Sequence, residues 1–205
     1  MRGIISLFVL LCVAGCASPP STYYSLADLS ASTRVLPPRG GVDYGLNISQ
    51  VLVPAEVDRP QLVIRRDAQG ADLVLLNESL WAAPLSDQIR SALGAQLASA
   101  LDVPDLSLMD PPAGLKLREL GMRVTRFDLV FGQYAALALN WSEGSAGKSE
   151  RLCQVAVKVP VDSGVSALVE GQRTALQWTA QVIAARMKAD LPAPDDPVIL
   201  RNTCT

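Results

Sequence analysis

The sequence predicts an α+β fold in two layers, a mostly antiparallel sheet with two amphipathic helices on one face. Residues 150–159 alternate apolar and polar side chains, which is typical of a strand with one buried face. Two other segments, residues 84–102 and 165–188, repeat apolar side chains at spacings of three and four, which is typical of helices. The order is strands, a helix, three strands and a helix, so one sheet can bury both helices.

Seven segments have strand patterns. They cover residues 23–26, 46–53, 62–66, 73–77, 117–128, 133–142 and 150–159. The apolar phase of the second segment shifts at Ser49 and Gln50, which indicates a β-bulge. The third and fourth segments flank a polar stretch that ends in Gly70, which predicts a hairpin. Residues 143–147 are predicted to form a turn.

Prolines set the limits of the two predicted helices. Pro84 opens the first helix, and Pro104 ends it by Asp102, because proline disfavours helical geometry in the residue before it. On the second helix, one side carries the residues expected to face the sheet, namely Leu168, Gln172, Ala175, Thr179, Val182 and Ile183. The tail 189–205 contains three prolines and is therefore not expected to be a long helix.

The first sixteen residues have the layout of a bacterial lipoprotein signal. Arg2 supplies a positive charge, residues 4–11 form an apolar core, and the small residues Ala14 and Gly15 precede Cys16. The apolar run is shorter than the roughly 20 residues that span a bilayer. We expect cleavage before Cys16 and acylation of its thiol. The alternative is a plain signal peptide followed by a chance cysteine.

This signal divides the chain into three parts. Residues 1–15 are the signal peptide, residues 16–44 are a lipidated N-terminus and tether with a short first strand, and residues 45–205 are a single α+β domain. Ala17 follows the cysteine where an inner-membrane lipoprotein would have Asp. By resemblance to other bacterial lipoproteins, this implies the periplasmic face of the outer membrane.

Composition argues against several functions. The chain has 18 Lys and Arg, 20 Asp and Glu, and no histidine, and it has no basic run. The sequence therefore lacks the clustered basic residues that bind nucleic acid. The missing histidine removes the commonest general base and the commonest metal ligand, so we expect no catalytic residues and no metal site. The only expected non-protein group is the covalent lipid.

Two cysteines remain in the exported domain after Cys12 leaves with the signal and Cys16 is acylated. In an oxidising compartment, Cys153 and Cys204 are expected to form a disulfide that holds the C-terminal tail on the sheet. Two unpaired thiols are the alternative.

Two further features allow a structural or a binding interpretation. Asp58 and Arg59 follow a predicted strand, so they form either a local turn network or a partner-contact loop. Trp81 is either a core anchor or an interface hot spot.

Three blocks together resemble the PqiC-type (YmbA-like) auxiliary lipoproteins of ABC and Mce-domain transport systems. The blocks are residues 23–26 (Tyr-Tyr-Ser-Leu), 51–65 with its Asp-Arg-Pro-Gln core at 58–61, and 81–85 (Trp-Ala-Ala-Pro-Leu). The resemblance covers nearly the whole mature chain. Leu80 and Ala83 depart from the Arg and Glu that the family often has there.

The resemblance implies a non-catalytic accessory subunit of a lipid transport system between the two membranes, which supports envelope integrity. It implies an Mce-domain subunit as partner, a ring-shaped homo-oligomer, and contact or structural roles for Asp58, Arg59, Pro60 and Trp81. The alternative function is a lipid carrier that shields acyl chains between sheet and helices. An envelope hydrolase is a third, weaker alternative.

Overall fold

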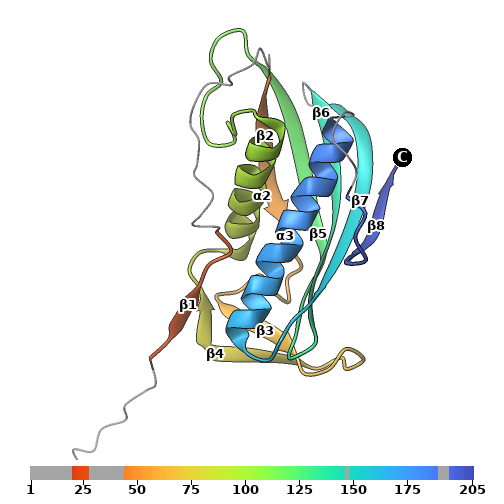
Figure 1. Cartoon of the computed structure of the whole chain (residues 1–205). Helices are drawn as coiled ribbons and strands as arrows, with labels where there is room; N and C mark the ends of the chain where they lie inside the picture. The colour runs from red at the N-terminus through yellow and green to blue at the C-terminus, as the bar shows by residue number, and fades with distance from the viewer. Residues whose placement is uncertain (1–19, 28–43, 146–147, 189–193) are drawn as a thin grey trace, which may run out of the picture.

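The computed structural model describes residues 20–27, 44–145, 148–188 and 194–205, which form a sheet covered by helices (Figure 1). In chain order the elements are β1 (Thr22–Tyr24), β2 (Tyr44–Leu52), β3 (Gln61–Arg65), β4 (Leu73–Trp81), α2 (Leu85–Leu101), β5 (Lys116–Val130), β6 (Tyr134–Ser145), β7 (Lys148–Pro160), α3 (Val165–Met187) and β8 (Ile199–Cys204).

The strands of this part of the chain form one mixed sheet of order β1-β4-β3-β5-β6-β7-β8, in which β2 also pairs with β5. The pairs β3–β4, β5–β6, β6–β7 and β7–β8 are antiparallel. The pairs β1–β4, β2–β5 and β3–β5 are parallel. The predicted α+β fold with a mostly antiparallel sheet is confirmed.

The helices α2 and α3 lie side by side across one face of the sheet (Figure 1). Every residue that the sequence placed on the buried side of α3 is buried, including the polar Gln172 and Thr179. Apolar side chains from both helices and the sheet form one core cluster. The two-layer arrangement therefore follows from the helix periodicity.

The backbone of α3 comes close to the sheet at Gly171. A Cβ atom at this position would lie 2.3 Å from Cγ1 of Val161 and 2.9 Å from Cβ of Ala135 on β6. Glycine is therefore required by the close approach, although alanine is the better helix former.

Two strands contain irregular steps. The register of β2 against β5 shifts between Ile48 and Val51, so the predicted bulge at Ser49 and Gln50 is confirmed. A second shift, on β5 between Val124 and Arg126, was not predicted. It inserts Thr125 and reverses which side chains face the helices beyond this point.

In the C-terminal half, one prediction needs correction and another gains detail. Residues 143–147 were expected to form a turn, but β6 continues through Ser145. Glu143 stays in the ladder opposite Arg151, and its carboxylate pairs with Arg118. The tail, expected to be non-helical and held on the sheet through Cys204, forms the edge strand β8 in a segment that follows its last proline. No helix in the described ranges is long and apolar enough to cross a membrane.

Candidate functional site

The N-terminal segment, residues 22–26, is fixed to the domain at several points. β1 pairs with the end of β4, and the amide of Ala82 donates to the carbonyl of Tyr24 at 2.8 Å. The amide of Leu26 donates to Oε1 of Gln88 on α2 at 2.7 Å, and the Leu26 side chain is 1% exposed. The short first strand is therefore part of the sheet, at the edge where the chain arrives from Cys16.

The side chains of Asp58, Arg59 and Pro60 lie exposed on the turn between β2 and β3. The amide of Asp58 donates to the carbonyl of Pro54 at 3.1 Å, which closes the turn, and the carbonyl of Pro60 accepts from the amide of Trp81 at 2.7 Å. The backbone of this block joins the turn to β4, and its three side chains are presented outward.

Trp81 belongs to the core instead. Its side chain is 5% exposed, and its ring meets Phe127 of β5 edge to face, with centroids 6.0 Å apart. This position agrees with the core-anchor alternative, and the indole offers little surface to a partner. The buried Trp81 side chain is therefore separate from the exposed side chains at 58–60, although the Trp81 amide bonds to the carbonyl of Pro60.

A pocket of about 340 Å³ lies beside the bulged part of β5. Along this edge β5 pairs with β2 as far as Arg123 and with β3 only at Val130. Within the described ranges, the stretch 124–129 therefore has β6 as its only strand partner. The pocket occupies this gap, between the turn after β2 and the β3–β4 hairpin.

Two arginines in the pocket wall share one buried carboxylate. Asp128, 6% exposed, accepts from Nε of Arg65 at 3.2 Å and from Nε of Arg126. Nη2 of Arg126 also donates to the hydroxyl of Tyr134 at 3.2 Å, and Nζ of Lys158 lies 4.0 Å from the centre of that ring. The hydrogen bond that Arg126 donates to the Asp128 carboxylate is the main cause that raises the pKa of Arg126 above its usual value, whereas burial acts to lower it.

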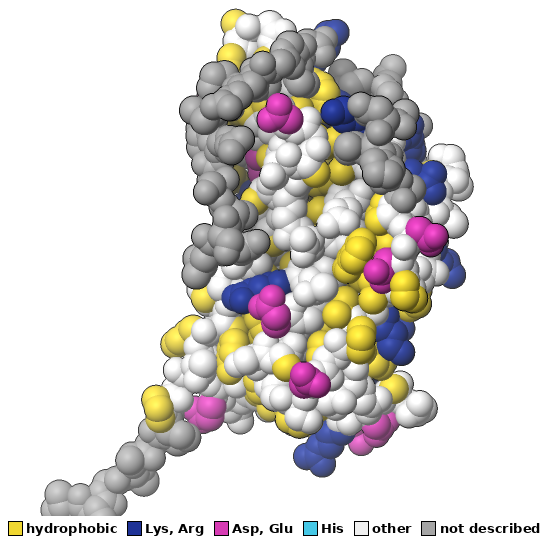
Figure 2. Space-filling model, viewed as in Figure 1, with side chains coloured by type: hydrophobic (Ala, Val, Ile, Leu, Met, Phe, Trp, Pro, Cys, Tyr) yellow, Lys and Arg dark blue, Asp and Glu magenta, His cyan; other side chains and the backbone are white. Residues whose placement is uncertain are grey.

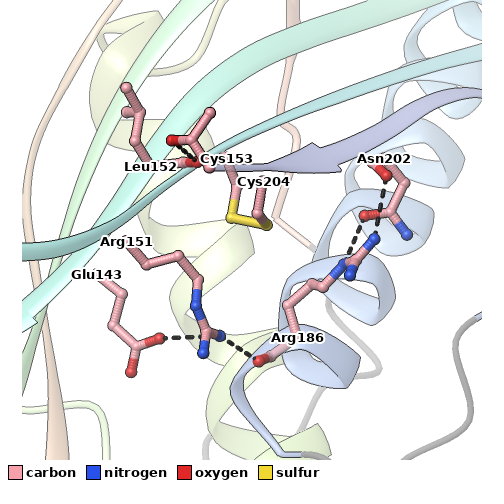
Figure 3. Close-up of a disulfide and its surroundings, with 8 residues drawn as sticks. Glu143, Arg151, Leu152, Cys153, Arg186, Asn202 and Cys204 are labelled. Carbon is pink, nitrogen blue, oxygen red and sulfur yellow. Dashed lines mark hydrogen bonds and ion pairs between the residues drawn. A yellow bond between two sulfur atoms is a disulfide. The ribbon is translucent and has the colours of Figure 1, made fainter.

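Ionic contacts surround the C-terminal end of α3, next to a disulfide between Cys153 and Cys204 (Figure 3). Arg151 lies 3.6 Å from Glu143 and donates to the carbonyl of Arg186. The guanidinium of Arg186 in turn donates to Oδ1 of Asn202 on β8 at 2.9 Å. A cation near the last carbonyls of a helix is favourable, because these carbonyls carry the negative end of the helix dipole.

Cys16, the expected acylation site, lies outside the described residues. The sequence interpretation also missed two contacts, the hydrogen bonds that Arg173 on α3 donates to the carbonyl of Ser25 and the bond that Arg65 donates to Asp128. Only one signal was visible beforehand. Arg126 and Asp128 are two residues apart in a strand, so these opposite charges share one face.

The helix face of the molecule carries scattered charges. Figure 2 shows Lys and Arg interspersed with Asp and Glu, and the coloured part of this view has no continuous basic patch. The surface in this view thus presents no extended charge of one sign.

Two solved structures share the fold. A crystal structure described as an uncharacterized protein matches with a TM-score of 0.64 at 21% identity, covering 83% of this chain and all of that one. Protein XCC0632 from Xanthomonas campestris matches with a TM-score of 0.63 at 16% identity, covering 82% of this chain and 94% of that one. At these identities the likeness concerns the fold alone.

Sequence comparison identifies the family. The chain is 30% identical over 130 residues to the intermembrane transport lipoprotein PqiC of Escherichia coli K12, and equally to that of Shigella flexneri. The match spans 62% of this chain and 66% of each relative, slightly under two thirds of their length. The model of the ABC-type transport auxiliary lipoprotein component matches residues 24–184, which run from the first strand to the end of the second helix. The chain therefore belongs to the family of ABC-type transport auxiliary lipoproteins.

Proposed function

We propose that this protein is a non-catalytic accessory subunit of an Mce-domain lipid transport system, anchored by acylated Cys16 at the periplasmic face of the outer membrane. The mature chain would begin at Cys16 and form one domain that docks the transporter and supports envelope integrity. Membership of the transport lipoprotein family, with the relation to PqiC, is the observation that carries the proposal.

The attachment of the N-terminal segment supports an anchoring role. Five residues lie between Cys16 and Thr22, and the six residue steps reach about 20 Å when the chain is extended. Because residues 22–26 are bound to the sheet and to both helices, the domain would stay close to its acyl chains. A binding surface held near one membrane raises the effective concentration of its partner there.

The exposed turn at Asp58, Arg59 and Pro60 is the contact that we propose for the Mce-domain subunit. A rigid scaffold that presents an exposed turn is a common arrangement for binding.

A ring of copies would use the two ends of the strand order, β1 and β8, which differ from each other. A contact between one edge and the other in the next copy would be heterologous, which gives a ring where the rotation closes.

The alternative function, a lipid carrier that shields acyl chains between the sheet and the helices, has less support. In the described ranges, apolar side chains of the sheet and the helices bury one another in a core that fills this interface. We therefore keep docking as the principal function.

Docking can be tested in the envelope by cross-linking to a tagged Mce-domain subunit from the same organism. Arg59→Glu should reduce the cross-linked product, while Arg66→Glu, also exposed but on the β3–β4 hairpin, serves as the matched control. Equal cross-linking by both variants, with unchanged melting, would remove the turn from the interface. Failure of the native chain to cross-link would reject the Mce partnership.

The anchor has a separate test. Mass spectrometry of the mature protein should find a triacylated Cys16, and Cys16→Ser should leave an unprocessed precursor. Ala17→Asp should move the protein to the inner-membrane fraction of a density gradient, whereas Ala17→Ser should not. An unmodified N-terminus on freely diffusing protein would refute the anchoring proposal.

A further inference from the structure

The pocket beside β5 combines a small set of charges with a narrow apolar wall. The charged lining residues are Glu56, Arg65, Arg126 and Asp128. The apolar wall is mainly Leu73, which is 37% exposed, because the other large apolar lining residues, Val57, Val63, Phe127 and Leu129, are each at most 5% exposed. A cavity of this size with convergent polar groups beside an apolar surface can hold a small molecule.

The two arginines retain unused hydrogen-bond donors. Arg65 uses Nε for Asp128 and Nη1 for the carbonyl of Gly70 at 3.4 Å. Arg126 uses Nε for Asp128 and Nη2 for Tyr134. Among the described residues, Nη2 of Arg65 and Nη1 of Arg126 have no acceptor. One carboxylate thus serves two guanidinium groups, and their remaining N–H groups suit the oxygens of a phosphate.

The fourth charge restricts the class of ligand. Glu56 stands exposed on the turn after β2 and lines the same pocket. With Asp128 it balances the two arginines, so the lining carries no net charge and does not favour a simple anion. A ligand that carries both a phosphate and an ammonium group would instead complement both signs.

We propose that this pocket binds the head group of an ethanolamine phospholipid, with the phosphate at Arg65 and Arg126, the ammonium at Glu56, and the first methylene groups along the apolar wall. The proposal goes beyond the docking role, because it requires no partner protein. The two proposals therefore stand or fall by separate measurements.

Binding can be measured by calorimetry on the full mature chain carrying Cys16→Ser, which removes only the acylation site. The probes are dihexanoyl phosphatidylethanolamine, dihexanoyl phosphatidylglycerol, free phosphoethanolamine and hexyl maltoside. The ethanolamine lipid should bind saturably, about tenfold more tightly than the glycerol lipid, as expected for one added charged hydrogen bond. Hexyl maltoside should not bind.

Variants assign the binding to this pocket. Arg126→Gln should weaken both phospholipids about tenfold. Arg123→Gln, on the same strand and exposed but outside the pocket, should leave both affinities unchanged. Glu56→Gln, at an exposed position, should abolish the preference for ethanolamine without affecting folding. Together these results would support the site even if Arg126→Gln proved unstable.

Several outcomes would overturn the proposal. These are no saturable binding of the ethanolamine lipid, equal binding of the two phospholipids, or an ethanolamine preference that survives Glu56→Gln. The free phosphoethanolamine arm distinguishes the source of the ligand. Weaker binding than the lipid supports a membrane lipid, whereas equal or tighter binding overturns the role of the apolar wall and points to a soluble phosphate ester.

Discussion

The guanidinium of Arg173 donates two hydrogen bonds to the carbonyl oxygen of Ser25, from Nε at 3.0 Å and from Nη2 at 2.6 Å. The two residues are 148 positions apart in the chain. Arg173 also pairs with Glu170 one turn earlier on α3 at 3.0 Å. This arginine thus connects the second helix to the segment that follows the expected lipid anchor.

Removing this link should loosen the N-terminal segment. Arg173→Ala should lower the free energy of unfolding by about 1–2 kcal/mol, since it removes two partly exposed charged hydrogen bonds to one carbonyl oxygen. Hydrogen exchange should accelerate at residues 22–26 and stay unchanged in β6. Glu170→Gln, which spares the bonds to Ser25, is the matched control, and equal exchange in both variants would contradict the assigned role.

Gln172 joins α3 to the sheet through two backbone acceptors. Its Nε2 donates to the carbonyls of Asp128 and Ala136, each at 3.0 Å, and the residue is fully buried. Gln172→Leu keeps a similar volume but leaves both carbonyls without this donor, so we expect a loss of about 2–4 kcal/mol in urea unfolding. Gln177→Leu, on the exposed side of the same helix, should change stability little.

For Gly171→Ala, we expect a change in stability opposite to the one that helix propensity alone predicts. Alanine would favour the helix by about 1 kcal/mol. The contacts with Val161 and Ala135 are too short for a Cβ atom, and overpacking costs about 1–3 kcal/mol. Thermal melting of Gly171→Ala should therefore show a net loss. Adding Val161→Ala should recover part of it, and a stabilised single variant would show that α3 can move away from β6.

The disulfide should stabilise the domain by fastening β8. It closes a loop with a sequence separation of 51 residues, which suggests about 2–4 kcal/mol if the native geometry is relaxed. The double variant Cys153→Ala/Cys204→Ala should melt at a lower temperature than the native chain. Reductant should lower the native melting temperature to a similar degree and leave that of the double variant unchanged.

The contribution of the Arg126–Asp128 ion pair to folding stability should not change when the pH is raised moderately above neutral. The raised pKa means that its contribution to folding is complete below the ordinary arginine pKa and is lost only as the pH rises through the higher folded value. The stability difference between the native chain and Arg126→Gln should therefore be the same at about pH 7 and about pH 9. A difference that fell over this range would mean that another titrating group governs the cluster.

Local patterns in the sequence were sufficient for most of the elements. The helix faces and the bulge at Ser49 and Gln50 could be read because each depends on residues within about two turns or one strand. The bulge at Thr125 could not, since a single threonine among β-forming residues fits either phase. The parallel pairing of β2 with β5 is set by tertiary contacts between distant segments.

The candidate pocket could not be predicted from the sequence for a similar reason. It depends on a gap between β2 and β3, and on Arg65 reaching Asp128 from another strand. No residue spacing in the sequence predicts this contact between Arg65 and Asp128. By contrast, the local sequence predicted a loop at Asp58 and Arg59, the family resemblance added Pro60, and the structure presents all three side chains outward.

The parallel pairing of β1 with β4 has a mechanical consequence. If the transporter pulls on the body of the domain while the acyl chains stay in the bilayer, tension enters at Thr22 and runs along the strand. The hydrogen bonds between β1 and β4 are then sheared together instead of being broken one by one. The hydrogen bonds from Arg173 to the carbonyl of Ser25 resist the same force. Such a joint would resist transient force while the domain itself remains intact.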